Sequence, residues 1–215
     1  MKWAALLALA AGALWAEDAP RLAYSKSFPN SVPPFVLVML EKNGDAQYKE
    51  AVDDELPVKF KMSEADTQTM FGLAEKLDYF KHPLESPVKV AFMGAKTFRY
   101  ENGDSKTEVK FNFTEDPNGQ ALLDWFERMS ESAQHRVSLE RAAKYDRLGV
   151  MKALTLLESA IDRKRIVGLD QFLPILDRIS KSESYMHAAR AIAAEIAEGI
   201  RNGHDAGTPG PAGKP

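Results

Sequence analysis

Residues 96–129 constrain the fold most, because their apolar period changes from that of a strand to that of a helix. Two runs, residues 97–101 and 108–113, flank an Asn102-Gly103 turn. The apolar residues of the second run are Val109, Phe111 and Phe113. They alternate with polar residues, which is typical of a strand with one buried face. An Asn-Gly pair supplies the positive φ angles of a tight turn, so the pattern predicts a β-hairpin.

A helix is predicted directly after this hairpin. Asp116 can cap its first turn, and Pro117 suits the first helical position. The apolar residues that then recur at helical spacing are Leu122, Phe126 and Met129. Because the apolar faces of hairpin and helix are joined by only a few residues, we expect them to pack together with Phe111 buried between them.

The first 16 residues have the layout of a secretory signal peptide. Lys2 provides a basic start, residues 3–15 carry no charge, and Ala16 precedes a polar stretch. The apolar run is shorter than the roughly 20 residues that a membrane-spanning helix needs. An uncleaved anchor and a buried core helix are the alternatives. We expect cleavage and a periplasmic or extracellular location.

Composition narrows the class of protein further. The chain has no cysteine, so disulfides, thiolate metal sites and a lipid-modified cysteine are excluded. Stability must come from an ordinary hydrophobic core, which a chain of this length can supply. The net charge is −3, and Lys2 would be lost with the leader. This acidic balance argues against nucleic acid as a partner.

Several strands are expected before the hairpin. Residues 21–25 fit a short strand, and residues 35–40, apolar at every position, fit a strand that is central or covered on both faces. An Asn43-Gly44 turn leads into a return strand over residues 46–50. The apolar residues of a third alternating run are Val58, Phe60 and Met62.

A helix is predicted to start at Ser63, which can cap it. Its expected apolar stripe is Met70, Leu73, Ala74, Leu77 and Phe80. A further short strand is expected over residues 88–92. Meanders that are followed by helices favour an antiparallel sheet with helices on one face.

This layout resembles that of small uncharacterised secreted bacterial α+β domains of unknown function. In those domains a Gly-Asp hairpin turn, a strand, a Ser-capped helix, a second hairpin and a second helix follow in order. The corresponding segments here are residues 43–45, 59–62, 63–66 and 98–113. The resemblance covers roughly the first half of the mature chain and implies a fold and a compartment. It implies no catalytic residues.

Three amphipathic helices are expected in the C-terminal part. Their apolar residues are Val150, Leu154, Leu157 and Ile161, then Phe172, Leu173, Leu176 and Ile179, and finally Tyr185, Ala189, Ile192, Ile196 and Ile200. Asp170 is expected to cap the second helix, with Pro174 in its first turn. Short loops favour antiparallel packing.

We therefore predict an α+β fold, with an antiparallel sheet of hairpins, helices on one face and an all-helical C-terminal segment. The predicted parts are a signal peptide (residues 1–16), an α+β domain with a long helix (17–148), a helical segment (149–201) and a disordered tail (202–215). The helical segment either docks on the sheet domain or binds a partner.

The four histidines, His82, His135, His187 and His204, have no metal-ligand spacing. Glu131 and His135 lie four apart on a predicted helix, and we interpret them as a surface i,i+4 pair. His82 is expected to close a helix, and His187 to lie on the surface.

Four other segments have features of a site. We interpret residues 53–55 as a solvated acidic loop rather than a calcium loop. Asn112 begins a glycosylation acceptor but is expected to lie on a strand. Residues 163–165 are a basic run too short for nucleic acid. In residues 93–96, Gly94 is expected to mark a bulge, a close backbone approach or a ligand contact.

These features favour an exported, non-enzymatic binding or interaction module whose C-terminal helices contact another envelope protein. No catalytic, cofactor-binding or metal-binding residue is predicted, and no membrane span is expected after cleavage. One alternative is a hydrolase in which Glu131, His135 or residues 93–96 act. The other is a small-ligand-binding protein with a site between sheet and helices.

Overall fold

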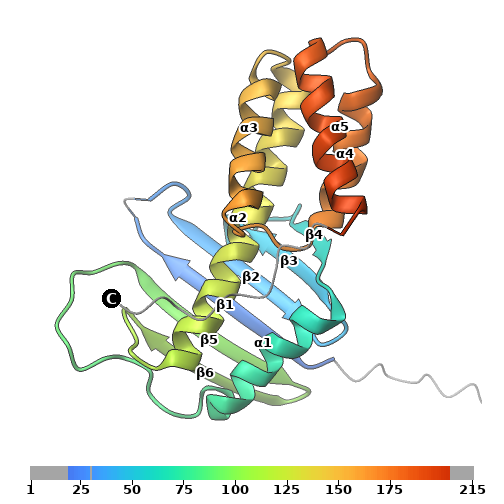
Figure 1. Ribbon diagram of the computed structural model, residues 1–215. Helices are drawn as coiled ribbons and strands as arrows, with labels where there is room; N and C mark the ends of the chain where they lie inside the picture. Colours follow the sequence, from blue (N-terminus) through green and yellow to red (C-terminus); the bar gives the residue numbers. More distant parts are fainter. Residues whose placement is uncertain (1–18, 30, 204–215) are drawn as a thin grey trace, which may run out of the picture.

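The computed structural model describes residues 19–29 and 31–203. The strands are β1 (Arg21–Ser27), β2 (Phe35–Glu41), β3 (Asp45–Lys49), β4 (Val58–Lys61), β5 (Ala95–Asn102) and β6 (Ser105–Phe111). The helices are α1 (Glu64–Lys76), α2 (Pro117–Tyr145), α3 (Gly149–Asp162), α4 (Leu173–Lys181) and α5 (His187–Arg201), with short 3₁₀ turns η1 (Asp78–Phe80) and η2 (Leu169–Phe172). The predicted α+β class is confirmed (Figure 1). The predicted signal peptide and residues 204–215 of the predicted tail lie outside the described residues.

All six strands form one antiparallel sheet in the order β4-β3-β2-β1-β5-β6. The two middle strands are β2, which the sequence predicts to be central or covered on both faces, and β1, which it predicts only as a short strand. Strand β1 pairs with β2 on one side and with β5 on the other. Ala23 lies opposite Met39 and Arg99. Both pairings continue to Ser27, so β1 is longer than predicted.

The two Asn-Gly turns form as expected. Gly44 has a φ of 92° and Gly103 a φ of 54°, in the left-handed region that glycine adopts without strain. A Cβ on Gly44 would also lie 2.9 Å from the carbonyl oxygen of Met62, so the turn lies tightly against the end of β4. These turns explain the register of the hairpins β2–β3 and β5–β6.

The main core lies between the sheet and helices α1 and α2, which cover the same face (Figure 1). The ring of Phe98 on β5 lies 4.9 Å from that of Phe111 on β6 and 5.8 Å from that of Phe126 on α2. Phe111 is buried, as predicted, and belongs to the same core as Leu122 and Met129. Strand β6 ends at Phe111, however, and Phe113 is only half-buried.

Helix α1 starts as predicted and ends earlier. The Ser63 side chain accepts a hydrogen bond from the Asp66 amide at 3.1 Å. The helix ends at Lys76 because residues 78–80 have φ angles of 47°, 48° and 68°, which a right-handed helix cannot contain. This turn still brings Phe80 into the core, and it holds the Tyr79 ring 4.4 Å from that of Tyr100.

The short strand expected over residues 88–92 does not form. The Ser86 amide donates to the Phe113 carbonyl at 2.8 Å, and the Met93 amide donates to the Asn112 side chain at 2.7 Å. Between these two anchors the segment pairs with no described strand. Alternation alone cannot form a strand without a neighbour, so Val88 and Phe92 remain exposed.

Helix α2 joins two hydrophobic cores. Its first half packs on the sheet, and its second half contributes Leu139 and Ala143 to a separate core with α3, α4 and α5. In Figure 1 this bundle extends away from the sheet along α2. The C-terminal helices therefore form their own core with α2 rather than a second layer on the sheet.

Two details of the C-terminal helices differ from expectation. Asp170 caps no helix, because it lies within η2 and α4 begins at Leu173, after a Phe172 cap without a side-chain hydrogen bond. Tyr185 precedes α5, and its hydroxyl donates to the Ala143 carbonyl at 2.9 Å. Pro174 lies in the first turn of α4 as predicted. Among the described residues, no helix is both long and apolar enough to cross a membrane.

Candidate partner-binding groove

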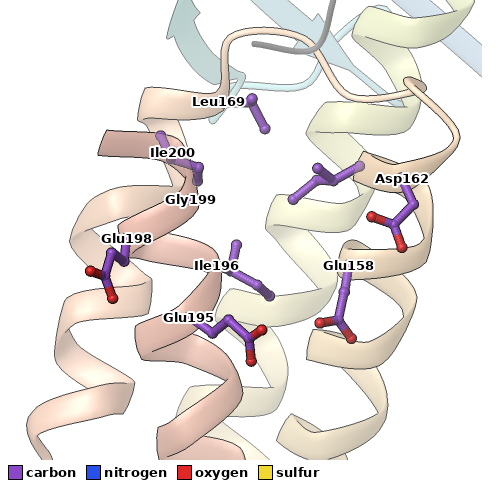
Figure 2. Close-up of a pocket in the computed structure, with 9 residues that line it drawn as sticks. Glu158, Asp162, Leu169, Glu195, Ile196, Glu198, Gly199 and Ile200 are labelled. Carbon is purple, nitrogen blue, oxygen red and sulfur yellow. The ribbon is translucent and has the colours of Figure 1, made fainter. Parts of the chain in front are cut away.

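A groove of about 360 Å³ opens between α3 and α5 at the end of the bundle nearer the sheet (Figure 2). Its floor is apolar and is formed by Ile161, Leu169, Ile196 and Ile200. These residues are the ends of the apolar stripes that the sequence predicts for the two helices, together with one residue of η2. The same stripes bury Leu157 and Ala189 deeper in the bundle, so the groove is a continuation of the core onto the surface.

Gly199 opens the α5 side of the groove. A Cβ built there would meet no atom within 4 Å, so the space beside the helix is empty. A larger residue would narrow this space. The groove therefore has room for an apolar side chain from outside over Ile196 and Ile200.

Four acidic residues line the groove: Glu158, Asp162, Glu195 and Glu198. The carboxylates of the first three lie beside the floor, whereas that of Glu198 points away from it (Figure 2). In Figure 2, Glu158 on α3 and Glu195 on α5 point toward one another across the groove. None of the four makes an ion pair or side-chain hydrogen bond with any residue that the structure describes. The rim is therefore acidic, and its carboxylates have no ion-pair partner in the described part of the chain.

The direction of the two helices adds to this negative field. Both α3 and α5 end near the sheet, so the groove lies beside two helix C-termini, which carry partial negative charge. Arg201 in the last turn of α5 is held by Asp177 of α4 at 2.6 Å. Acidic residues at such a position reduce helix stability, and this arrangement favours a cation from outside the described fold.

Glu131 and His135 do not form the predicted surface pair. Arg165 donates to both carboxylate oxygens of Glu131, at 2.8 and 3.0 Å, and also to Asp124 at 2.5 Å. His135 is half-buried, and burial lowers its pKa, although Glu131 acts in the opposite direction. No His135–Glu131 ion pair lies within the described residues, because Glu131 faces the loop that follows α3.

One residue of the basic run 163–165 forms ion pairs with α2 that the local sequence does not indicate. Arg163 and Lys164 are exposed, whereas Arg165 turns inward to α2. The hydrogen bonds that Arg165 donates to Glu131 and Asp124 raise the pKa of its guanidinium. Its partners lie 34 and 41 positions away in the chain, beyond the reach of any local spacing rule.

Residues 93–96 are explained by close packing rather than by a ligand. Gly94 has a φ of 99°, and a Cβ there would lie 3.2 Å from the Ser27 carbonyl. Lys96 is buried and donates to the Asn112 carbonyl at 2.6 Å. Burial lowers the pKa of Lys96. The expected close backbone approach is therefore present.

The remaining candidates are surface features. The Asn112 side chain lies just beyond β6 rather than on it, and it binds the backbone of Ala91 and Met93. His82 follows η1 rather than a helix end and lies 3.2 Å from Asp78. His187, the first residue of α5, is exposed, and His204 lies outside the described residues.

The acidic loop of residues 53–55 is largely exposed, and Asp54 caps it by accepting from the Leu56 amide at 3.0 Å. No group of three or more His, Asp or Glu residues suited to a metal ion occurs in the described part of the chain. No protein-family model matches the chain, and no curated protein matches it.

Proposed function

We propose that the chain is an exported, non-enzymatic module that binds a basic, amphipathic segment of another envelope protein in the groove between α3 and α5. The export half rests on Lys2, the uncharged run of residues 3–15 and Ala16. The mass of the N-terminal peptide from the native host tests it, and an intact Met1 would contradict it.

The binding half rests on one observation: carboxylates without a described partner surround an apolar floor. An apolar floor attracts apolar side chains, and a charged rim selects their neighbours. A helix with apolar residues on one stripe and Lys or Arg beside it matches both features. Its apolar side chains lie over Ile196 and Ile200, and its basic ones lie beside Glu158 and Glu195.

Two other occupants fit less well. A second copy would bring an equally acidic groove to a chain whose net charge is already −3. The chain's own residues 204–215 contain one lysine, Lys214, and no large apolar residue. A basic partner is therefore the occupant that the charges favour.

Titration of the protein with an amphipathic Leu/Lys peptide tests this proposal. We expect the peptide to perturb the α3 and α5 residues around the groove in NMR spectra. Because the attraction is electrostatic, affinity should fall as salt is added. Glu158→Lys and Glu195→Lys should each weaken binding by about tenfold, because a repulsive charge replaces an attractive one.

The matched control is Glu183→Lys, which makes the same charge change on an exposed loop residue away from the groove. It should alter affinity much less than the groove variants. A Leu/Glu peptide of the same length should not bind. Equal weakening by all three variants, or equal binding of both peptides, would contradict the proposal.

A further inference from the structure

A second hollow, of about 290 Å³, lies between β1, the segment that leads into β2, and the first half of α2. It is distinct from the α3–α5 groove, with which it shares no residue. The side chains that matter for its chemistry are Tyr24, Lys26, Val36, Glu127, Ser130 and Gln134. Glu131 also lines the cavity, and its carboxylate is held by Arg165.

Tyr24 lines this cavity and carries a buried hydroxyl without a described partner. Its side chain is 1 % exposed, and its hydroxyl has no hydrogen-bond partner among the described residues. The ring is held 5.4 Å from that of Phe126 and 5.9 Å from that of Phe98, so it is fixed in the core. A buried hydroxyl without a partner is unfavourable, and a ligand atom in the cavity can satisfy it.

Lys26 and Glu127 add opposite charges from facing elements, β1 and α2. Neither forms an ion pair or side-chain hydrogen bond in the described part of the chain, with each other or with another residue. Burial raises the pKa of Glu127, and the positive charge of Lys26 partly opposes this effect. The two side chains therefore flank the cavity as separate, partly desolvated charges.

The neighbouring cations are already engaged, whereas Lys26 is not. Lys96 donates to the Asn112 carbonyl, and Arg165 binds Glu131 and Asp124. Among the described residues that line the cavity, Lys26 is therefore the cation that can bind an anion.

The remaining polar groups are acceptors. The Gln134 amide nitrogen donates to the Tyr48 hydroxyl at 3.0 Å, which leaves its carbonyl oxygen for another donor. The Ser130 hydroxyl donates to the Phe126 carbonyl at 2.9 Å and keeps its lone pairs. Val36 supplies an apolar wall.

We infer that this cavity binds a small zwitterion of the α-amino acid class. The ligand carboxylate binds the Lys26 ammonium and the Tyr24 hydroxyl. The ligand ammonium binds Glu127 and the Gln134 carbonyl, and an apolar side chain lies over Val36. The cavity is at the small end of ligand pockets, which range from about 300 to 1,000 Å³, so it suits an amino acid better than a nucleotide.

NMR titration with L-valine, N-acetyl-L-valine and L-valinamide tests both charge requirements. L-valine should shift the amide signals of β1 and of α2 around Glu127. The acetylated form lacks the ammonium and the amide form lacks the carboxylate, so each should bind at least about tenfold more weakly. Absence of shifts with L-valine, L-methionine and glycine, or equal binding of the three valine compounds, would overturn the inference.

Two variants locate the site. Glu127→Gln and Tyr24→Phe should each weaken L-valine binding by about tenfold, because each removes one polar contact. The Tyr24→Phe protein should unfold at the same denaturant concentration as the parent or a higher one, because only an unsatisfied hydroxyl is lost. Weakened binding with retained stability separates a ligand contact from a structural role.

Glu75→Gln is the matched control for Glu127→Gln, and Lys89→Met is a second surface control; both residues are exposed and lie outside the cavity. Their L-valine affinity should equal that of the parent protein. Unchanged L-valine binding in both the Glu127→Gln and the Tyr24→Phe proteins would reject the site. This test does not involve α3 or α5, so its failure leaves the peptide-binding proposal standing.

Discussion

At the scale of single residues, the strand period of β6 separates side chains that neighbour each other in the chain but differ in their surroundings. Phe111 is 3 % exposed, whereas Lys110 is exposed and lies 3.4 Å from Glu108 on the outer face. One position along a strand reverses the side of the sheet that a side chain faces. These two residues therefore make a sensitive test of the register.

Phe111→Ala should lower the free energy of unfolding by about 3–5 kcal/mol, because it leaves a cavity beside Phe98 in the core. Lys110→Ala should change it by no more than about 0.5 kcal/mol. Chemical denaturation followed by circular dichroism gives both values. Similar midpoints for the two variants would show that the register of β6 is wrong.

At the scale of elements, Arg165 and its neighbours attach the end of the bundle to α2. Besides the Arg165 contacts, the Val167 amide donates to the Ser132 hydroxyl of α2 at 2.8 Å, and Val167 is part of the core under the sheet. Arg136 of α2 in turn donates to the Lys59 carbonyl of β4 at 2.8 Å. The loop after α3 and the sheet are therefore held by the same helix.

Arg165→Met should lower the free energy of unfolding by about 1 kcal/mol, because the pair with Glu131 is bidentate but partly exposed to solvent. Hydrogen exchange at the Val167 amide should accelerate as the loop loosens. Arg163→Met is the matched control: its side chain is exposed, and the change should stay within about 0.5 kcal/mol. Equal effects of the two substitutions would mean that Arg165 does not hold this loop.

At the scale of the whole molecule, α2 contributes to two hydrophobic cores that have no buried residue in common. The core under the sheet draws its residues from positions 22–133, apart from Val167, and the bundle core begins at Leu139. The proposed peptide groove belongs to the second core, and the proposed amino acid cavity belongs to the first. A substitution in the α3–α5 groove can therefore alter peptide binding without loss of amino acid binding in the cavity, and the reverse also holds.

A chain that ends at Tyr145 should keep the sheet folded and lose the groove. We expect dispersed NMR signals from the strands, because the sheet core loses only Val167. The last turns of α2 should fray, since Leu139 and Ala143 lose their cover. The Leu/Lys peptide should no longer bind, while L-valine binding should persist. Loss of all cooperative unfolding would show instead that the two cores form one folding unit.

Local chemistry was enough to predict most elements of this protein. The Asn-Gly turns, the Ser63 and Asp116 caps and the apolar stripes of the C-terminal helices are encoded within a few neighbouring residues, and all of them form. Two predictions made from local patterns are wrong. Residues 88–92 alternate like a strand but have no neighbour to pair with, and Asp170 lies in a 3₁₀ turn instead of capping a helix.

Only the tertiary structure decided where these elements meet. The central position of β1 depends on pairing with strands 35–41 and 95–102, and Glu131 is bound by Arg165 rather than by its helical neighbour His135. Both candidate sites arise in the same way. The carboxylate rim combines α3 with α5, and the cavity brings Tyr24 and Lys26 to Glu127 from more than 100 positions away. Periodicity reports which face of an element is buried, but contacts between distant segments depend on how the whole chain packs.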